Sequence, residues 1–306
     1  MKHIVWIFMS IVLLAACGQS YEEQKRLSRL ERIRLMKEDS AALKVAVMPT
    51  LDCLPMYVAR EYNLFDTLGA DVRLKYFTAQ MDCDTALTGG SVEGSITDVV
   101  RGQRMIRRGT PLNYVTATNA YWQLITNRNS RIKELKQLDD KMLAMTRYSA
   151  TDLLGDYAVD SVKLKSDRVF RIQINDVNLR LLMLLNNEMD AMLLTEPQAT
   201  EARLNKGKVL MDTRKMNMKF GAIAFRTKAM KDKNRQKQLD VFIKAYNMAC
   251  DSINKYGAAR YRDLIVKYCK VKEVAADTLA KDIRFTHVAP PRQKDIDRAD
   301  RWLDKQ

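Results

Sequence analysis

Short apolar segments alternate with helical segments from Leu43 onward, and this alternation limits the folds open to the chain more than any other feature. In the first set, the expected strands are Leu43–Met48, Val72–Tyr76, Ser95–Thr97 and Leu112–Thr118. The helices expected between them are Pro55–Leu64, Asp82–Leu87 and Asp98–Arg108. A nearly continuous apolar strand such as Leu43–Met48 is typical of a parallel strand that is buried on both faces. The alternation therefore predicts an open, doubly wound α/β sheet.

A second set of the same kind follows. Its expected strands are Lys141–Met145, Val169–Ile174, Ala191–Leu194 and Lys208–Met211, and its expected helices are Thr151–Val162, one capped by Asp176 and one opened by Pro197. The apolar face of the helix that Asp176 caps is expected to consist of Leu179, Leu182, Met183 and Leu185. Phe220–Phe225 is expected to return to the first sheet as a strand. Beyond it we expect helices, apart from an extended piece around His287.

Polar residues follow the carboxyl end of the expected strands in both sets. In the first set they are Thr50, Asp52, Thr78, Thr97, Asp98, Thr118 and Asn119, and in the second set Ser149, Thr151, Asn175, Asp176, Thr195 and Glu196. Open α/β sheets bind ligands outside these strand ends, where helix N-termini offer unpaired N–H groups. The alternative is that these residues are helix caps, which favour the same residue types, and we expect about half of them to be caps only. The pattern predicts a cleft between two lobes.

Several segments resemble a known family. They are Leu43–Asp52, Tyr57–Ala59, Leu64–Phe65, Ala86–Gly90 with Thr97–Asp98, and Asn187–Ala191 with Glu196–Pro197. In this order and spacing they resemble the periplasmic solute-binding proteins of ABC importers, in the branch that contains the thiamine-pyrimidine, aliphatic-sulfonate and nitrate binders. The resemblance covers most of residues 43–226 and, more loosely, the helical tail.

The resemblance implies a type II periplasmic-binding-protein fold, in which two α/β lobes joined by a hinge hold the ligand between them. Lobe 1 would comprise residues 43–121 and 221–306 and lobe 2 residues 124–218, with crossings near Tyr121–Gln123 and Lys219–Gly221. The ligand-binding residues that it implies are Thr50, Leu51, Asp52, Thr97, Asp98, Ser149, Asp176 and Glu196. The identity of the ligand does not carry over, because the details of the pocket depart from the family pattern.

The first residues have the pattern of a secretory signal. Lys2 supplies a positive charge, and Ile4–Ala16 is almost entirely apolar or small. This run is too short for a membrane span, which needs about 20 such residues. Leu14–Cys17 followed by Gly18 resembles the bacterial lipoprotein box, in which the cysteine is lipidated and becomes the new N-terminus; an ordinary signal peptide is the alternative.

We therefore expect a lipoprotein signal peptide at 1–16, lipidation at Cys17, and a lipid anchor with a charged helical spacer over 17–42. In this spacer, Leu27, Leu30 and Ile33 recur at three-residue spacing, as in an amphipathic helix. The protein is expected to be exported and tethered to a bacterial membrane, facing the periplasm or the cell exterior.

The charge of the chain does not indicate a nucleic-acid-binding protein. The formal net charge is +15 at pH 7, but Lys and Arg alternate with Asp and Glu in segments such as 22–39 and 228–240. A nucleic-acid-binding protein instead concentrates its basic residues in a recognisable module. We expect solvated helix faces, with attraction to anionic lipid or an acidic partner as the alternative.

The histidine content argues against an enzyme. The chain has two histidines, and His3 lies in the expected signal peptide, which leaves His287 as an expected surface or packing residue. A site with several histidine ligands is therefore excluded, and a catalytic triad or dyad would depend on that one residue. One relative of the resembled family is a thiamine-pyrimidine synthase that uses its own histidine and a cysteine-rich iron site, and this chain has no cysteine cluster. We expect no catalytic activity, no metal and no cofactor.

The cysteines that follow the signal peptide leave two states open. Cys53 and Cys83 each follow a strand and precede a helix in adjacent units, in a compartment that permits disulfides. A bridge between them across the floor of the cleft is one state, and free thiols are the other. Cys250 and Cys269 flank Gly257 unequally, which places them about 7.5 Å out of register in a helical hairpin, so we expect no bridge between them.

The expected cleft residues indicate a class of ligand. The carboxylates of Asp52, Asp98, Asp176 and Glu196 would repel a small inorganic anion unless Arg147 and helix N-termini outweighed them. Nearby aromatic side chains could stack on a ring or pack in the core or hinge: Tyr57, Tyr121, Trp122 and Tyr148. We therefore expect a monomer that captures a neutral or cationic heterocycle, such as a pyrimidine precursor of thiamine, and delivers it to the permease of an ABC importer. A ligand-sensing or scaffold lipoprotein without a transport role is the alternative.

Overall fold

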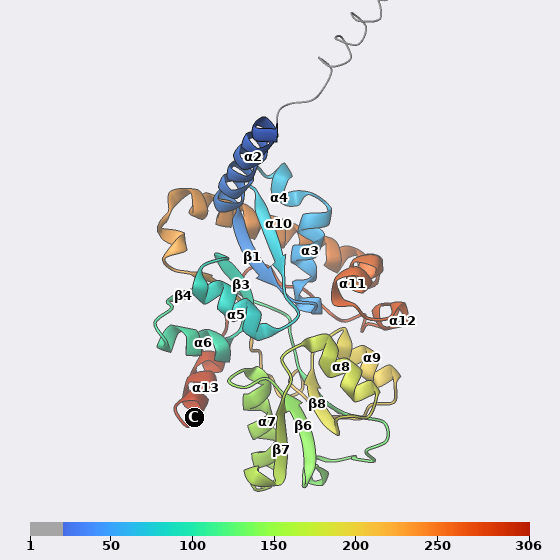
Figure 1. Cartoon of the computed structure of the whole chain (residues 1–306). Helices are drawn as coiled ribbons and strands as arrows, with labels where there is room; N and C mark the ends of the chain where they lie inside the picture. Colours follow the sequence, from blue (N-terminus) through green and yellow to red (C-terminus); the bar gives the residue numbers. More distant parts are fainter. Residues whose placement is uncertain (1–20) are drawn as a thin grey trace, which may run out of the picture. The chain divides into compact units, whose positions relative to one another are not determined.

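The computed structural model describes residues 21–306, with side chains from residue 28 onward (Figure 1). The signal peptide expected at 1–16 and the lipidation expected at Cys17 lie outside the described residues. The chain divides into two compact units between Ala42 and Leu43.

The first unit contains helix α2 (Tyr21–Ala41), where the sequence predicts a helical spacer. Its apolar side chains Leu30, Ile33, Leu35 and Met36 are exposed. Within the part of the chain that the structure describes, no helix is both long and apolar enough to cross a membrane.

The second unit begins with a sheet of five strands in the order β2-β1-β3-β10-β4. Its strands are β1 (Leu43–Val47), β2 (Val72–Tyr76), β3 (Gly94–Asp98), β4 (Leu112–Ala117) and β10 (Gly221–Arg226). β1 pairs in parallel with β2 and β3, whereas β10 is antiparallel to β3 and β4. Val45, Ala46 and Val47 are fully buried, so both faces of β1 lie in the core, as its apolar run predicts. We call the part of the unit built on this sheet lobe 1.

The helices of lobe 1 begin and end where local sequence favours it. They are α3 (Leu54–Glu61), α4 (Leu64–Thr67), α5 (Gln80–Gly89), α6 (Val99–Arg107), α10 (Lys233–Tyr256), α11 (Arg262–Cys269) and α12 (Glu273–Asp277), with short 3-10 helices at Leu51–Cys53, Ala229–Lys231 and Ala258–Tyr261. Pro55 lies in the first turn of α3, where no N–H is required. Gly90 ends α5 with a φ of +83°, a conformation that glycine adopts without strain.

The second sheet also has five strands, in the order β7-β6-β8-β5-β9, and we call the part built on it lobe 2. Its strands are β5 (Gln123–Thr126), β6 (Lys141–Met145), β7 (Val169–Gln173), β8 (Ala191–Leu194) and β9 (Val209–Asp212), with helices α7 (Ala150–Ser161), α8 (Val177–Leu185) and α9 (Gln198–Leu204) and 3-10 turns at Leu135–Leu138 and Ser166–Arg168. β5, which is antiparallel to β8 and β9, is not among the strands predicted from the sequence. It has only four residues and follows the crossing directly, so it has no room for a strand pattern of its own.

The predicted apolar face of α8 is wrong for Leu179 and Leu182, whereas Met183 and Leu185 are half-buried against the core. The buried side chains of α8 are Val177, Arg180, Leu181 and Leu184, whereas Leu179 is 47% and Leu182 is 53% exposed. The buried residues follow the helical spacing i, i+3, i+4 and i+7. An arginine occupies the second of these positions, so the stripe does not look apolar in the sequence.

Two connections join the lobes. The chain passes from β4 to β5 through residues 118–122 and returns from β9 to β10 through residues 213–220. The lobes also bond to each other directly. The backbone N–H of Leu51 donates to the carbonyl oxygen of Glu196 at 2.7 Å, and that of Val177 donates to Thr78 at 3.1 Å. In this structure the lobes are therefore in contact.

The C-terminal helix α13 (Gln293–Leu303) contacts both lobes (Figure 1). Gln103 of α6 donates a hydrogen bond to Asp300 at 2.7 Å. Two residues further along the helix, the indole N–H of Trp302 donates to Asp156 of α7 at 2.6 Å. The helix thus links the lobes through its C-terminal residues, and Arg292 at its N-terminus donates to Asn217 of the second connection.

The described cysteines Cys53, Cys83, Cys250 and Cys269 are free and buried. Of the two states left open by the sequence, the structure shows free thiols, and the bridge between Cys53 and Cys83 is not formed. The sulfur of Cys53 instead accepts the backbone N–H of Met48 at 3.5 Å. Burial raises the pKa of the Cys53 and Cys83 thiols, which keeps both protonated.

Candidate functional site

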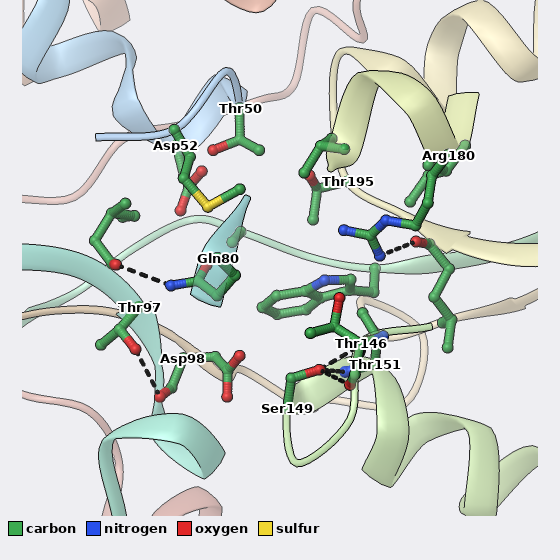
Figure 2. A pocket seen from close by; sticks show the side chains of 17 residues that line it. Thr50, Asp52, Gln80, Thr97, Asp98, Thr146, Ser149, Thr151, Arg180 and Thr195 are labelled. Carbon is green, nitrogen blue, oxygen red and sulfur yellow. Dashed lines mark hydrogen bonds between the residues drawn. The ribbon is translucent and has the colours of Figure 1, made fainter. Parts of the chain in front are cut away.

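The carboxyl ends of strands from both sheets meet at one cavity (Figure 2). It is lined from lobe 1 and the first connection by Met48, Thr50, Asp52, Gln80, Ile96, Thr97, Asp98, Ala120 and Trp122, and from lobe 2 by Thr146, Ser149, Thr151, Val177, Arg180, Leu193, Leu194 and Thr195. The centres of water-sized molecules can occupy about 50 Å³ of it. One water needs about 10–15 Å³ on this scale, so with the lobes in contact the cavity holds only a few non-hydrogen atoms.

Two buried carboxylates form the wall on lobe 1. Asp52 follows β1 and accepts a hydrogen bond from the hydroxyl of Thr118 at 2.9 Å. Asp98 caps α6 by accepting the backbone N–H of Arg101 at 3.0 Å. Burial raises the pKa of both side chains, that of Asp98 to about 6, because desolvation disfavours the ionised form. Neither carboxylate forms an ion pair among the described residues, so this wall offers strong hydrogen-bond acceptors.

Hydroxyl groups at the start of α7 form one corner of the cavity. Ser149 donates to the carbonyl oxygen of Thr146 at 2.7 Å and accepts the backbone N–H of Thr151 at 3.1 Å. The hydroxyl of Thr151 accepts the backbone N–H of Thr146 at 2.9 Å. These bonds fix the turn between β6 and α7, so Ser149 serves as a helix cap while it lines the cavity.

Arg180 forms the wall on lobe 2 and is not among the site residues predicted from the sequence. Its side chain is 6% exposed, and its Nη1 donates to the carbonyl oxygen of Leu193 at 3.2 Å. Its Nε has no hydrogen-bond partner. Burial lowers the pKa of Arg180 to about 10, which still leaves the guanidinium charged at neutral pH. The signal in the sequence was a single arginine on the helix face that carries Val177, Leu181 and Leu184.

The predicted site residues divide into two groups. Those that line the cavity are Thr50, Asp52, Thr97, Asp98 and Ser149. Asp176 does not, because its carboxylate caps α8 by accepting the backbone N–H groups of Asn178 and Leu179. Leu51 and Glu196 line a smaller hollow that Asp52 and Tyr121 share.

Glu196 is already fully bonded. It forms an ion pair with Arg203 at 2.7 Å and accepts hydrogen bonds from the hydroxyls of Thr200 at 2.6 Å and Tyr121 at 2.9 Å. These bonds join the first connection to α9. The structure therefore favours a structural role for Glu196 over direct contact with a ligand.

Of the aromatic side chains expected near the cleft, Trp122 lines the cavity. Tyr57 is buried and stacks on Tyr268, with 4.3 Å between the ring centroids. Tyr148 lies under the guanidinium of Arg104 at 4.2 Å. Stacking on a ligand ring therefore depends on Trp122, while the others pack against protein groups.

His287 is exposed, and its Nε2 lies 2.7 Å from a carboxylate oxygen of Asp251. This confirms the prediction of a surface residue. Among the described residues, no group of three or more His, Cys, Asp or Glu side chains is arranged to hold a metal ion.

Two α/β lobes around one cavity at the strand ends define the class of two-lobed solute-binding folds. The chain belongs to the NMT1/THI5-like family, whose model matches residues 50–256. This match agrees with the family resemblance predicted from the sequence. No curated protein sequence matches the chain.

Solved structures share the fold. The alkanesulfonate-binding protein SsuA from Xanthomonas axonopodis pv. citri, bound to MOPS, has a TM-score of 0.73 at 15% identity, over 87% of this chain and 92% of that chain. The ligand-binding component of an ABC-type import system from Staphylococcus aureus has a TM-score of 0.72 at 15% identity, over 87% and 92%. The nitrate-binding protein NrtA from Synechocystis PCC 6803 has a TM-score of 0.68 at 14% identity, over 81% and 73%. These matches confirm the type II periplasmic-binding-protein fold.

Proposed function

We propose that this protein is a lipid-anchored solute-binding protein that captures a small molecule between its lobes and delivers it to the permease of an ABC importer. The observation that carries the proposal is the cavity, because strand ends and helix N-termini from both sheets line it. Membership of the NMT1/THI5-like family supports a binding protein rather than an enzyme. We expect a monomer that faces the periplasm or the cell exterior, with α2 as the spacer behind the lipid anchor.

Capture would depend on rotation of the lobes about their two connections. The backbone bonds from Leu51 to Glu196 and from Val177 to Thr78 exist only while the lobes are in contact. A ligand that touches both walls of the cavity binds the closed form more tightly than the open form. It therefore shifts the population toward the closed form by the difference in affinity.

For the ligand, the sequence favours a neutral or cationic heterocycle such as a pyrimidine precursor of thiamine. Asp52 and Asp98 support this choice as buried acceptors for ring amino groups, and Trp122 supplies a flat apolar face. The first compound to assay is therefore 4-amino-5-hydroxymethyl-2-methylpyrimidine.

The test combines thermal melting with small-angle scattering. A ligand present at about 100 times its Kd stabilises the folded state by about 2.7 kcal/mol, which raises the melting temperature measurably. We expect a compound from a small-molecule panel to do this and to reduce the radius of gyration. If no compound changes either quantity, the capture mechanism is wrong and the scaffold alternative gains. Binding without any loss of uptake in a deletion strain would instead favour a sensor.

A further inference from the structure

We propose that the ligand is a short amino carboxylate, a dipolar molecule whose carboxylate pairs with Arg180 and whose amino group faces Asp52 and Asp98. This inference rests on the proposed function as a solute-binding protein, and it replaces the heterocycle suggested by the sequence with a different class of ligand. It assigns to Arg180 the role of anion receptor in the cavity.

The buried charge of Arg180 lacks an ion-pair partner among the described residues. The guanidinium is buried, points into the cavity beside Thr195, and has no ion pair within the described part of the chain (Figure 2). Asp176 is the acidic side chain whose charge raises the pKa of Arg180, and its carboxylate is engaged with the N-terminal N–H groups of α8. A buried charge without a partner is costly, and arginine does not avoid this cost by releasing its proton. A ligand anion would supply the missing partner.

The donors of the Arg180 guanidinium differ in what they contact. Nη1 donates to the carbonyl oxygen of Leu193, and Nε is enclosed by protein atoms without a hydrogen-bond partner. Nη2 makes no hydrogen bond with the described residues. Nη2 is therefore the donor that remains for a ligand in this structure, and a carboxylate accepts a charge-assisted hydrogen bond from it. Nε lies on the same edge, so a carboxylate bound there accepts both parallel N–H groups once a small shift of the side chain opens Nε.

The two walls of the cavity carry opposite charges. Asp52 and Asp98 are buried on lobe 1, and Arg180 is buried on lobe 2. A purely anionic ligand would pair with Arg180 but leave two carboxylates facing it across the cavity. A purely cationic ligand would leave Arg180 unpaired. A ligand with opposite charges at its two ends satisfies both walls and links the two lobes.

The size of the cavity also limits the ligand. The cavity offers about 50 Å³ to the centres of water-sized molecules when the lobes are in contact. At about 10–15 Å³ for each water, this accommodates a chain of a few non-hydrogen atoms. A short amino carboxylate fits within this volume, whereas a substituted pyrimidine needs the lobes further apart or a different position of Trp122.

The test is calorimetric titration of the wild-type protein with matched compounds. The dipolar compounds are glycine, β-alanine and 4-aminobutanoate, the singly charged controls are propanoate and propylamine, and the neutral control is 4-amino-5-hydroxymethyl-2-methylpyrimidine. We expect at least one dipolar compound to bind at least about 10-fold more tightly than either singly charged control, because charged hydrogen bonds at both ends contribute. Preference for the pyrimidine, propanoate or propylamine would overturn the inference and leave the proposed function standing.

Substitutions of Arg180 test whether this residue binds the carboxylate of the ligand. Arg180→Gln is expected to weaken binding of the preferred dipolar compound about 10- to 100-fold, and Arg180→Lys to restore part of it. The matched control is Arg168→Gln, on the same lobe, whose exposed ion pair with Asp139 lies away from the cavity lining. If Arg180→Gln folds and binds as the wild type does, the inference is wrong. If that variant does not fold, the wild-type preference among the matched compounds decides. If neither these compounds nor a wider panel binds, the proposed function fails together with the inference.

Discussion

Ionised Asp98 lowers the free energy of unfolding at neutral pH, so a substitution that removes its charge should stabilise the protein. The pKa of this carboxyl is raised from 3.8 to about 6 by burial. Each pKa unit corresponds to about 1.36 kcal/mol, so ionised Asp98 costs about 3 kcal/mol of folding stability at pH 7.5. Asp98→Asn removes the charge and keeps a residue that caps α6 equally well. We expect the variant to be more stable by about 1–3 kcal/mol at pH 7.5, where the lower bound allows for imperfect hydrogen bonding of the amide.

The pH dependence of the stability difference shows whether the charge of Asp98 causes it. Between pH 3.8 and about 6 the folded state binds the proton of Asp98 more tightly than the unfolded chain does, so this group makes the wild type less stable as the pH rises. The advantage of the variant should therefore be full above about pH 7, shrink as the pH falls below about 6, and vanish only well below pH 3.8. Urea unfolding followed by circular dichroism at pH 7.5, 6.0 and 4.5 measures it.

The matched control is Asp176→Asn. Asp176 also caps a helix, α8, but it is only half-buried. It should show no comparable gain at pH 7.5. An Asp98→Asn variant that is no more stable than the wild type at pH 7.5, or whose advantage is the same at pH 4.5, would refute the reasoning.

Three further outcomes are expected. Cys17→Ala should abolish acyl labelling and membrane association in a fractionation assay, and survival of both would contradict the lipoprotein assignment. Glu196→Ala should cost about 2 kcal/mol in urea unfolding, because it removes the ion-pair partner of Arg203, whose side chain is 30% exposed and so partly solvated. A loss of ligand affinity with unchanged stability would point to direct ligand contact instead. Mass spectrometry without reduction should find the buried thiols free, with alkylation only after denaturation, whereas a mass lower by two hydrogens would indicate a bridge such as Cys53 to Cys83.

The order of strands and helices was predictable because the buried strands carry their pattern locally. β8 is apolar on both faces and β1 is apolar apart from Lys44, so each is visible in the sequence alone. β5 was not predictable, since Gln123–Thr126 becomes a strand only by pairing with β8 and β9, which lie far along the chain. Tertiary pairing, and not local preference, determines that element.

The position of the candidate site was predictable from the sequence, but not every residue that lines it. Strand ends locate the cavity, and Asp52 and Asp98 lie there as expected. Asp176 and Glu196 occupy equivalent places in the chain, but helix capping and an ion pair direct their carboxylates elsewhere. Arg180 lies a turn inside a helix, where no rule about strand ends would place a cavity residue. Only the packing of α8 shows that its side chain reaches the cavity.

The contact of α13 with lobe 2 also allows lobe displacement to be followed by the protein's own tryptophan fluorescence. The chain has three tryptophans, and Trp6 lies in the expected signal peptide. Trp302 is bonded to Asp156 where α13 meets lobe 2, and Trp122 lines the cavity. Indole emission is sensitive to a neighbouring carboxylate and to water, so the two remaining fluorophores report on separate events, lobe displacement and occupancy. Recording Trp302→Phe beside the wild type would resolve the two signals in time without any attached dye.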